Sequence, residues 1–163
     1  MILRRATHAD APAVWDVHRA AFERALEADL AERLRTDGDL LPALCFVAVA
    51  GDDVVGNVAV SRGRVGDAPV PALGPIGVLP AHQGRGIGSA LVHAVIGGAE
   101  ALGEQCVALL GSPGYYGRFG FGPSAPLEPP DPAWGEHFQV RRLTAWDGSL
   151  RGVFRYAAAF PDD

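Results

Sequence analysis

The chain has 163 residues, of which 48% are apolar and 20% charged, and a formal net charge of −5. This mildly acidic balance excludes a general nucleic-acid binder, because phosphate contacts need clustered positive charge, and it favours an amine partner. No segment approaches the ~20 apolar residues of a membrane helix and the start lacks signal-peptide order, so we expect a cytoplasmic protein with one domain over 1–163.

Hydrophobic spacing and turn residues predict a mixed α/β layout in the order β-α-α-β-β-β-α-β-α-β-β. In chain order, the predicted elements are a strand at 2–5, helices at 11–23 and 25–36, strands at 44–50, 54–61 and 72–78, a helix at 85–102, a strand at 105–110, a short helix at 115–119, and strands at 138–143 and 152–156. The second helix is predicted from Leu26, Leu30 and Leu34, which recur at helical spacing.

Glycine and proline mark the predicted connections. The segment 62–71 is predicted to be a loop, and the Pro-rich segment 123–132 an extended loop. Residues 123–163 are too short for a second core, so they are expected to complete the same domain. Asp162 and Asp163 are predicted to form a tail.

Both cysteines lie in apolar runs. Cys45 and Cys106 are therefore predicted to be buried structural thiols. Neither takes part in a spacing that would hold a metal, so no metal site is expected.

The strongest chemical signal follows the strand at 72–78, in the segment 83–89 with the sequence Gln-Gly-Arg-Gly-Ile-Gly-Ser. Glycine allows positive φ and close approach of backbone amides to a ligand. A helix start adds free N–H donors and the positive end of a dipole, and Arg85 adds a guanidinium suited to phosphate. The segment predicts an anion site, and a simple tight turn is the alternative.

Two other phosphate motifs fit less well. A dinucleotide fingerprint needs G-x-G-x-x-G directly after a strand, but Ser89 replaces the last glycine and the turn comes after Pro80. A P-loop needs a lysine, and all fourteen basic residues are arginine.

The segment 83–88 resembles the Q/R-x-x-G-x-G/A signature of the GNAT acetyltransferases. Residues 74–80 are similar to that family's fourth strand, and 115–121, Tyr-Tyr-Gly-Arg-Phe-Gly-Phe, to its Y-x-x-x-G-F element. The resemblance covers about residues 2–122, and the remainder resembles a bacterial subgroup of acetyltransferases.

The resemblance implies a mixed, partly splayed sheet flanked by helices, with acetyl-CoA as co-substrate between the fourth and fifth strands. It implies that backbone groups of Ile76 and Val78 bind the pantetheine arm. The residues expected around the pyrophosphate are Gln83, Gly84, Arg85, Gly86, Ile87, Gly88 and Ser89. Ser112 and Tyr116 are expected beside the thiol.

The implied reaction is N-acetylation, by direct attack of an amine of a small molecule or peptide on the thioester in a ternary complex. Tyr116 is the expected catalytic residue, as proton donor to the leaving thiolate, and Tyr115 is the alternative. The resemblance also makes the Val78 amide the expected oxyanion donor. The assembly is left open, with a homodimer as one option.

The general base is not evident, because the strand at 72–78 carries no ionisable side chain. Water, Glu23, His82 and Glu128 all remain candidates. The same absence supports an alternative function, that of a non-catalytic CoA-binding or sensing module.

Overall fold

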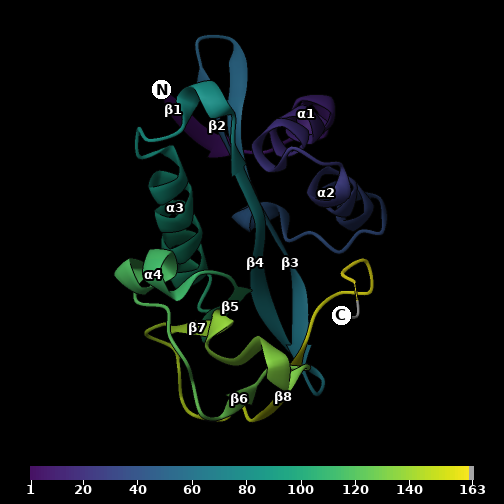
Figure 1. Ribbon diagram of the computed structural model, residues 1–163. Coiled ribbons are helices and arrows are strands. Elements are labelled where there is room, and N and C mark those ends of the chain that lie inside the picture. The colour runs from purple at the N-terminus through teal and green to yellow at the C-terminus, as the bar shows by residue number, and fades with distance from the viewer. Residues whose placement is uncertain (162–163) are drawn as a thin grey trace.

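The computed structural model describes residues 1–161 and contains a mixed eight-stranded sheet (Figure 1). The strands lie in the order β1-β2-β3-β4-β5-β7; β8 pairs with β3, and β6 pairs with β8. The strands are β1 (Ile2–Arg5), β2 (Phe46–Ala50), β3 (Asp53–Val65), β4 (Ala68–Val78), β5 (Cys106–Leu110), β6 (Leu127–Glu128), β7 (Phe138–Arg142) and β8 (Gly152–Arg155). The predicted mixed α/β class is confirmed, whereas the tail Asp162–Asp163 lies outside the described residues.

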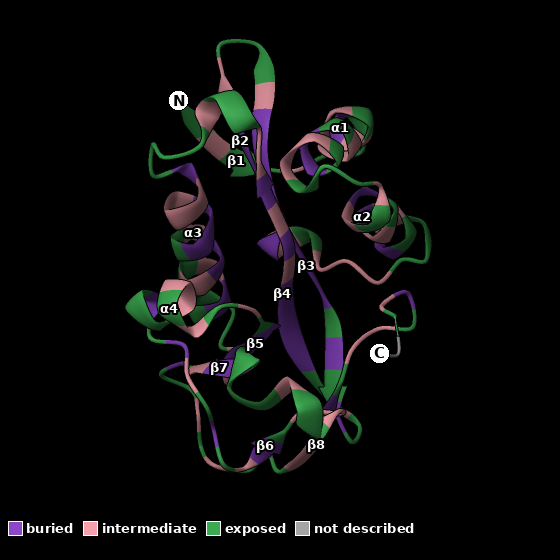
Figure 2. Ribbon diagram, in the orientation of Figure 1, coloured by how far each residue is buried: buried purple, intermediate pink, exposed green. Residues whose placement is uncertain are grey.

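Helices cover both faces of this sheet. They are α1 (Ala11–Phe22), α2 (Leu26–Thr36), α3 (Ile87–Ala101) and α4 (Pro113–Tyr116). Figure 1 shows α1 and α2 on one side of β3 and β4, and α3 and α4 on the other. Buried residues concentrate along β3 and β4, between these layers (Figure 2). No helix within residues 1–161 has the length and apolar character needed to cross a membrane.

The two cysteines belong to this core, as predicted. Cys45 and Cys106 are both buried and free. Burial raises the pKa of the Cys45 thiol to about 11 and that of Cys106 to about 12. Both thiols therefore stay protonated at neutral pH, and their role is to fill the core.

The prediction of a loop over 62–71 is wrong. β3 and β4 extend through this segment and meet at the turn Gly66-Asp67. Arg62 lies opposite Pro71, yet its amide donates to the carbonyl of Asp39 at 2.9 Å, on the other edge of β3. Arg62 and Pro71 therefore face each other without exchanging hydrogen bonds. The missing amide of Pro71 breaks no bond between β3 and β4, so the strand tolerates proline there.

The buried face of α2 also differs from the predicted leucine stripe. Ala28, Ala31 and Leu34 are buried, whereas Leu26 is 50% exposed. The small alanine side chains let α2 pack closely against α1. This packing rotates the N-terminal end of the leucine stripe toward solvent.

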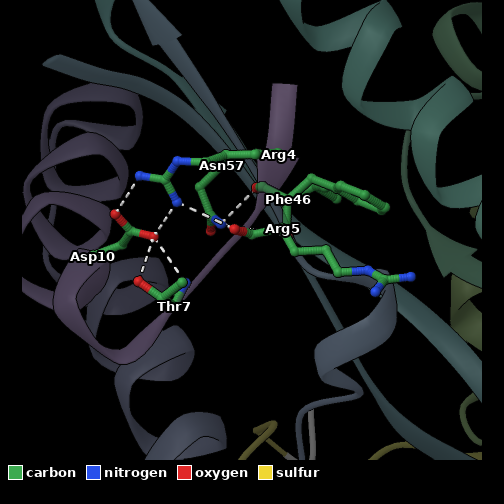
Figure 3. A network of polar contacts seen from close by, with 7 residues as sticks. Arg4, Arg5, Thr7, Asp10, Phe46 and Asn57 are labelled. Carbon is green, nitrogen blue, oxygen red and sulfur yellow. Dashed lines mark hydrogen bonds and ion pairs between the residues drawn. The ribbon is translucent and has the colours of Figure 1, made fainter. Parts of the chain in front are cut away.

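An ion pair fixes the start of α1 to β1 (Figure 3). Asp10 is 7% exposed and accepts from both terminal nitrogens of Arg4, at 2.7 and 2.9 Å. The Thr7 amide donates to the same carboxylate at 2.8 Å. The hydrogen bonds from Arg4, assisted by the Thr7 amide and opposed by burial, lower the pKa of Asp10 to about 2.

We expect Asp10→Asn to lower the free energy of unfolding at pH 7 by about 1–2 kcal/mol, a range that allows for solvent screening of the half-exposed Arg4. The folded-state pKa of Asp10 lies below its unfolded value of ~3.9, so its stabilisation is present above about pH 4 and is lost as pH falls through about 2. Urea unfolding at several pH values measures both effects. Asp52→Asn, in an exposed turn, is the control. An unchanged free energy of unfolding in Asp10→Asn at pH 7 would contradict the prediction.

Candidate active site

Strands β4 and β5 form a splayed pair. They run parallel and share one register position, Ala72 opposite Ala108. β4 continues to Val78 and remains paired with β3 on its other edge. The sheet therefore opens between β4 and β5, and the open edge of β4 includes Ile76 and Val78.

The main-chain groups of these two residues point into the opening. The Leu79 amide donates to Val55 of β3 at 2.8 Å, so it faces β3. Successive amides of an extended strand point to opposite edges. The Val78 and Ile76 amides therefore face away from β3, toward the side where β5 has diverged.

The glycine turn lies at the end of β4 and is open to solvent. Gly84 and Gly86 adopt φ of 75° and 82°, a left-handed region that disfavours other residues. A Cβ on either would meet no atom within 4 Å. Backbone conformation, rather than crowding, thus requires glycine here, and the surface above the turn is free for a ligand.

The N-terminus of α3 completes this turn. The first helical hydrogen bond runs from the Ala90 amide to the Gly86 carbonyl, at 3.0 Å. The amides of Ile87, Gly88 and Ser89 belong to the first turn, so they have no intrahelical acceptor. Gly86 has no side chain that could accept from them instead. With the exposed Arg85 beside them, these donors form a site suited to a phosphate-type anion.

Gln83 takes a different position from its neighbours. Its side-chain amide donates to the Val78 carbonyl at 3.0 Å. The side chain thus ties the turn back to the end of β4, which fixes the direction in which the glycines present their amides.

The two adjacent tyrosines face different sites. Tyr116 lines a cavity beside β4, and its ring packs so closely on Gly111 that a Cβ there would lie 2.5 Å from it. The Tyr115 hydroxyl instead lies at Gly88, 3.0 Å from where a Cβ would stand. Ser112 is the residue before α4, and its carbonyl accepts from the Tyr116 amide at 3.0 Å. Tyr116 is therefore the tyrosine that faces the opening.

That cavity has a volume of about 310 Å³ and lies between the α1–α2 junction, β4, the end of β5 and the C-terminal segment. Its lining is almost wholly apolar or aromatic: Phe22, Glu27, Leu30, Leu73, Gly74, Pro75, Ile76, Leu110, Tyr116, Trp134, Tyr156, Phe160 and Pro161. Burial raises the pKa of Tyr116 to about 12, with the neighbouring Tyr115 as a smaller cause, and burial also raises that of Tyr156. Both phenols are protonated donors at neutral pH.

Among the described residues of this lining, Glu27 is the one carboxylate, and the sequence pattern did not point to it. Its side chain is 12% exposed and pairs with Arg24, whose Nε donates to the two carboxylate oxygens at 2.9 and 3.0 Å. The candidates Glu23, His82 and Glu128 do not line the cavity. The predicted leucine stripe gave no sign of Glu27, because the rotation of α2 toward its alanine face brings Glu27 inward.

α1 packs directly on β4 at Gly77. A Cβ on Gly77 would lie 3.0 Å from His18 Nδ1 and 3.2 Å from the Ala21 side chain, so the position has little room for a side chain. His18 is fully buried, and its Nε2 lies 2.7 Å from Asn57 Oδ1. Asn57 Nδ2 donates to Phe46 (Figure 3), so Oδ1 is the acceptor and His18 carries its proton on Nε2.

A second cavity, of about 500 Å³, lies apart from these groups. It separates α1 and α2 from β3, and Trp15, Arg35 and Arg62 are among the residues that line it. Neither the glycine turn nor Tyr116 reaches it. Among residues 1–161, no group of three His, Cys, Asp or Glu side chains is placed to hold a metal ion.

The chain resembles known proteins in both sequence and structure. Residues 11–121 match the acetyltransferase (GNAT) family. The uncharacterized N-acetyltransferase YjhQ of Escherichia coli is 33% identical, over 94% of this chain and 90% of its own. The crystal structure of the E. coli GNAT family N-acetyltransferase YhbS in complex with CoA has a TM-score of 0.88 at 30% identity, covering 97% of this chain and 90% of that one. A Brucella melitensis GNAT family acetyltransferase in complex with acetyl-CoA has a TM-score of 0.82 at 30% identity, covering 98% and 97%.

The buried His18 makes stability depend on pH. Burial lowers its pKa below the usual ~6.5, against a smaller upward effect from Asn57. The unfolded chain therefore takes up a proton that the folded chain does not, so the free energy of unfolding falls below about pH 6.5, by at most about 1.4 kcal/mol per pH unit. We expect His18→Gln to reduce this slope between about pH 7 and 5 in urea titrations, and His137→Gln, at an exposed position, to retain it. Equal slopes in wild type and His18→Gln would refute the assignment.

Proposed function

Because the chain belongs to the acetyltransferase (GNAT) family, we propose that it transfers the acetyl group of acetyl-CoA to a primary amine of a small molecule or peptide. The observation that carries this proposal is the splayed β4–β5 pair, which opens beside free amides at the start of α3. The solved relatives with CoA and acetyl-CoA support the cofactor. We also propose that the chain acts as one domain, since β7 and β8 belong to the same sheet as β1–β5.

The cofactor would lie along one continuous line of donors. Its pyrophosphate would accept from amides in the segment 84–89, with Gln83 holding the turn in position and Arg85 adding charge. Its pantetheine arm would pair with the open edge of β4 at Ile76 and Val78, as an added strand does. The thiol end would then reach Ser112 and Tyr116.

The proposed reaction is a direct transfer. The amine lone pair attacks the thioester carbon and forms a C–N bond, the C–S bond then breaks, and the products are the N-acetylated amine and free CoA. The amine loses one proton and the sulfur gains one, so the transfer needs no other reactant. Holding both substrates in one site makes the attack effectively unimolecular. The Val78 amide, on the open edge of β4, would donate to the oxyanion.

Tyr116 would stabilise the departing sulfur. Its pKa of about 12 keeps the phenol protonated, so it can donate a hydrogen bond to the thiolate. A thiol has a pKa of ~8.5, so complete proton transfer from Tyr116 would be unfavourable by roughly 5 kcal/mol. We therefore assign Tyr116 a hydrogen bond to sulfur, and the proton released by the amine balances the thiolate.

The glycine turn gives a test of cofactor binding. We expect Gly86→Ala to raise the Kd for CoA at least about tenfold in calorimetric titration, because alanine disfavours the φ of 82° that directs the amides. Gly97→Ala, inside α3, is the matched control: its Cβ meets nothing within 4 Å, so it should leave the Kd unchanged and stabilise the protein by about 1 kcal/mol. Unchanged CoA affinity in Gly86→Ala would argue against the pyrophosphate site.

Thiol release from acetyl-CoA in the presence of amines tests turnover itself. We expect Tyr116→Phe to lower kcat by about 10–100-fold while the Kd for CoA stays nearly constant. Tyr115→Phe, whose hydroxyl lies at Gly88, should retain kcat. An unchanged kcat in Tyr116→Phe would show that the Tyr116 hydroxyl does not assist the departing sulfur. CoA binding without release for any amine would favour the non-catalytic CoA-binding module, which the acid-free β4 also supports.

A further inference from the structure

We propose that the acceptor is a small primary amine on an apolar, aromatic-sized skeleton, and that Glu27 binds its ammonium group. The inference rests on the proposed acetyl transfer and narrows it to one class of substrate. It follows from the walls of the 310 Å³ cavity and from Glu27, the one carboxylate among the described residues that line it together with Tyr116.

Aromatic side chains from the C-terminal segment form one wall of the cavity. The rings of Tyr156 and Phe160 stack with centroids 4.1 Å apart, and Trp134 lies 6.0 Å from Tyr156. These residues follow residue 121, where the match to the family ends. This wall offers π-faces and little hydrogen bonding, so it suits a flat apolar group.

The lining disfavours strongly polar acceptors. Among residues 1–161, Glu27 is the one acidic or basic side chain on this lining, and the further polar side chains there are two phenols and one indole. A sugar or polyamine would leave hydroxyls or a second ammonium there without partners, which costs several kcal/mol for each desolvated group. The volume is at the lower end for small-molecule sites.

Glu27 supplies the one specific attraction. Arg24, its partner, is 62% exposed and therefore contacts the carboxylate from the solvent side. Arg24 contacts the carboxylate three times, from Nε to both oxygens and from Nη2 to Oε1. A carboxylate has about four acceptor sites, so Oε2 retains one for an ammonium within the cavity. The nearby His18 has a lowered pKa and is neutral at pH 7, so it does not compete as a cation.

The same charge arrangement selects against acidic acceptors. An amino acid would bring its carboxylate next to Glu27, into a cavity on whose lining residues 1–161 place no basic side chain. Repulsion and desolvation both oppose that binding. A free amine without a carboxylate is favoured over the corresponding amino acid.

The test uses the full chain, acetyl-CoA and thiol release, with 2-phenylethylamine as the probe. Phenylalanine adds only a carboxylate to this skeleton, and 1,4-diaminobutane removes the ring and adds an ammonium. We expect kcat/KM for 2-phenylethylamine to exceed that of both by about 100-fold or more. Equal or faster turnover of either competitor, or of a peptide with N-terminal phenylalanine, would overturn the inference while leaving acetyl transfer intact.

A pair of matched variants tests the carboxylate. Glu27→Gln should raise KM for 2-phenylethylamine about tenfold, without a comparable change in the Kd for CoA. Glu136→Gln makes the same change at an exposed position outside the cavity and should leave KM unaltered. An unchanged KM in Glu27→Gln would overturn the role of Glu27. Absence of release with every amine would instead overturn the proposed function, and the inference with it.

Discussion

Beyond Ala72, β4 has a strand partner on one edge only, and the proposed site depends on this open edge. Amides at a strand edge require an acceptor when they are removed from water. The free amides of Ile87 and its neighbours begin where the same strand ends. A long ligand with an anionic group and an extended polar arm satisfies both sets of donors, and CoA has that form.

The side of β4 that packs against α1 bears on where the proposed acceptor site lies. α1 approaches so closely at Gly77 that this position has little room for a side chain. The hydrogen bond between His18 and Asn57 is part of this close packing. In the proposed acceptor site, α2 supplies the carboxylate of Glu27 to the cavity lining.

The two halves of the site come from parts of the chain with different roles. β4, the glycine turn and Tyr116 fall within residues 11–121, which match the family. Trp134, Tyr156 and Phe160 come from the C-terminal segment and line the proposed acceptor cavity. This division agrees with the general rule that a shared scaffold carries the common chemistry, while peripheral segments set the substrate.

From the sequence alone, the chain order of the main helices and strands and a glycine turn suited to an anion could be predicted, because both depend on contiguous residues. Gly84 and Gly86 reveal their positive φ by residue type, and the apolar helix follows directly. Only the tertiary structure decided that a strand continues through Pro71, because the amide of its partner Arg62 faces Asp39. It also decided which face of α2 is buried, and hence that Glu27 enters the cavity, because helix rotation is set by packing against another element rather than by spacing within one.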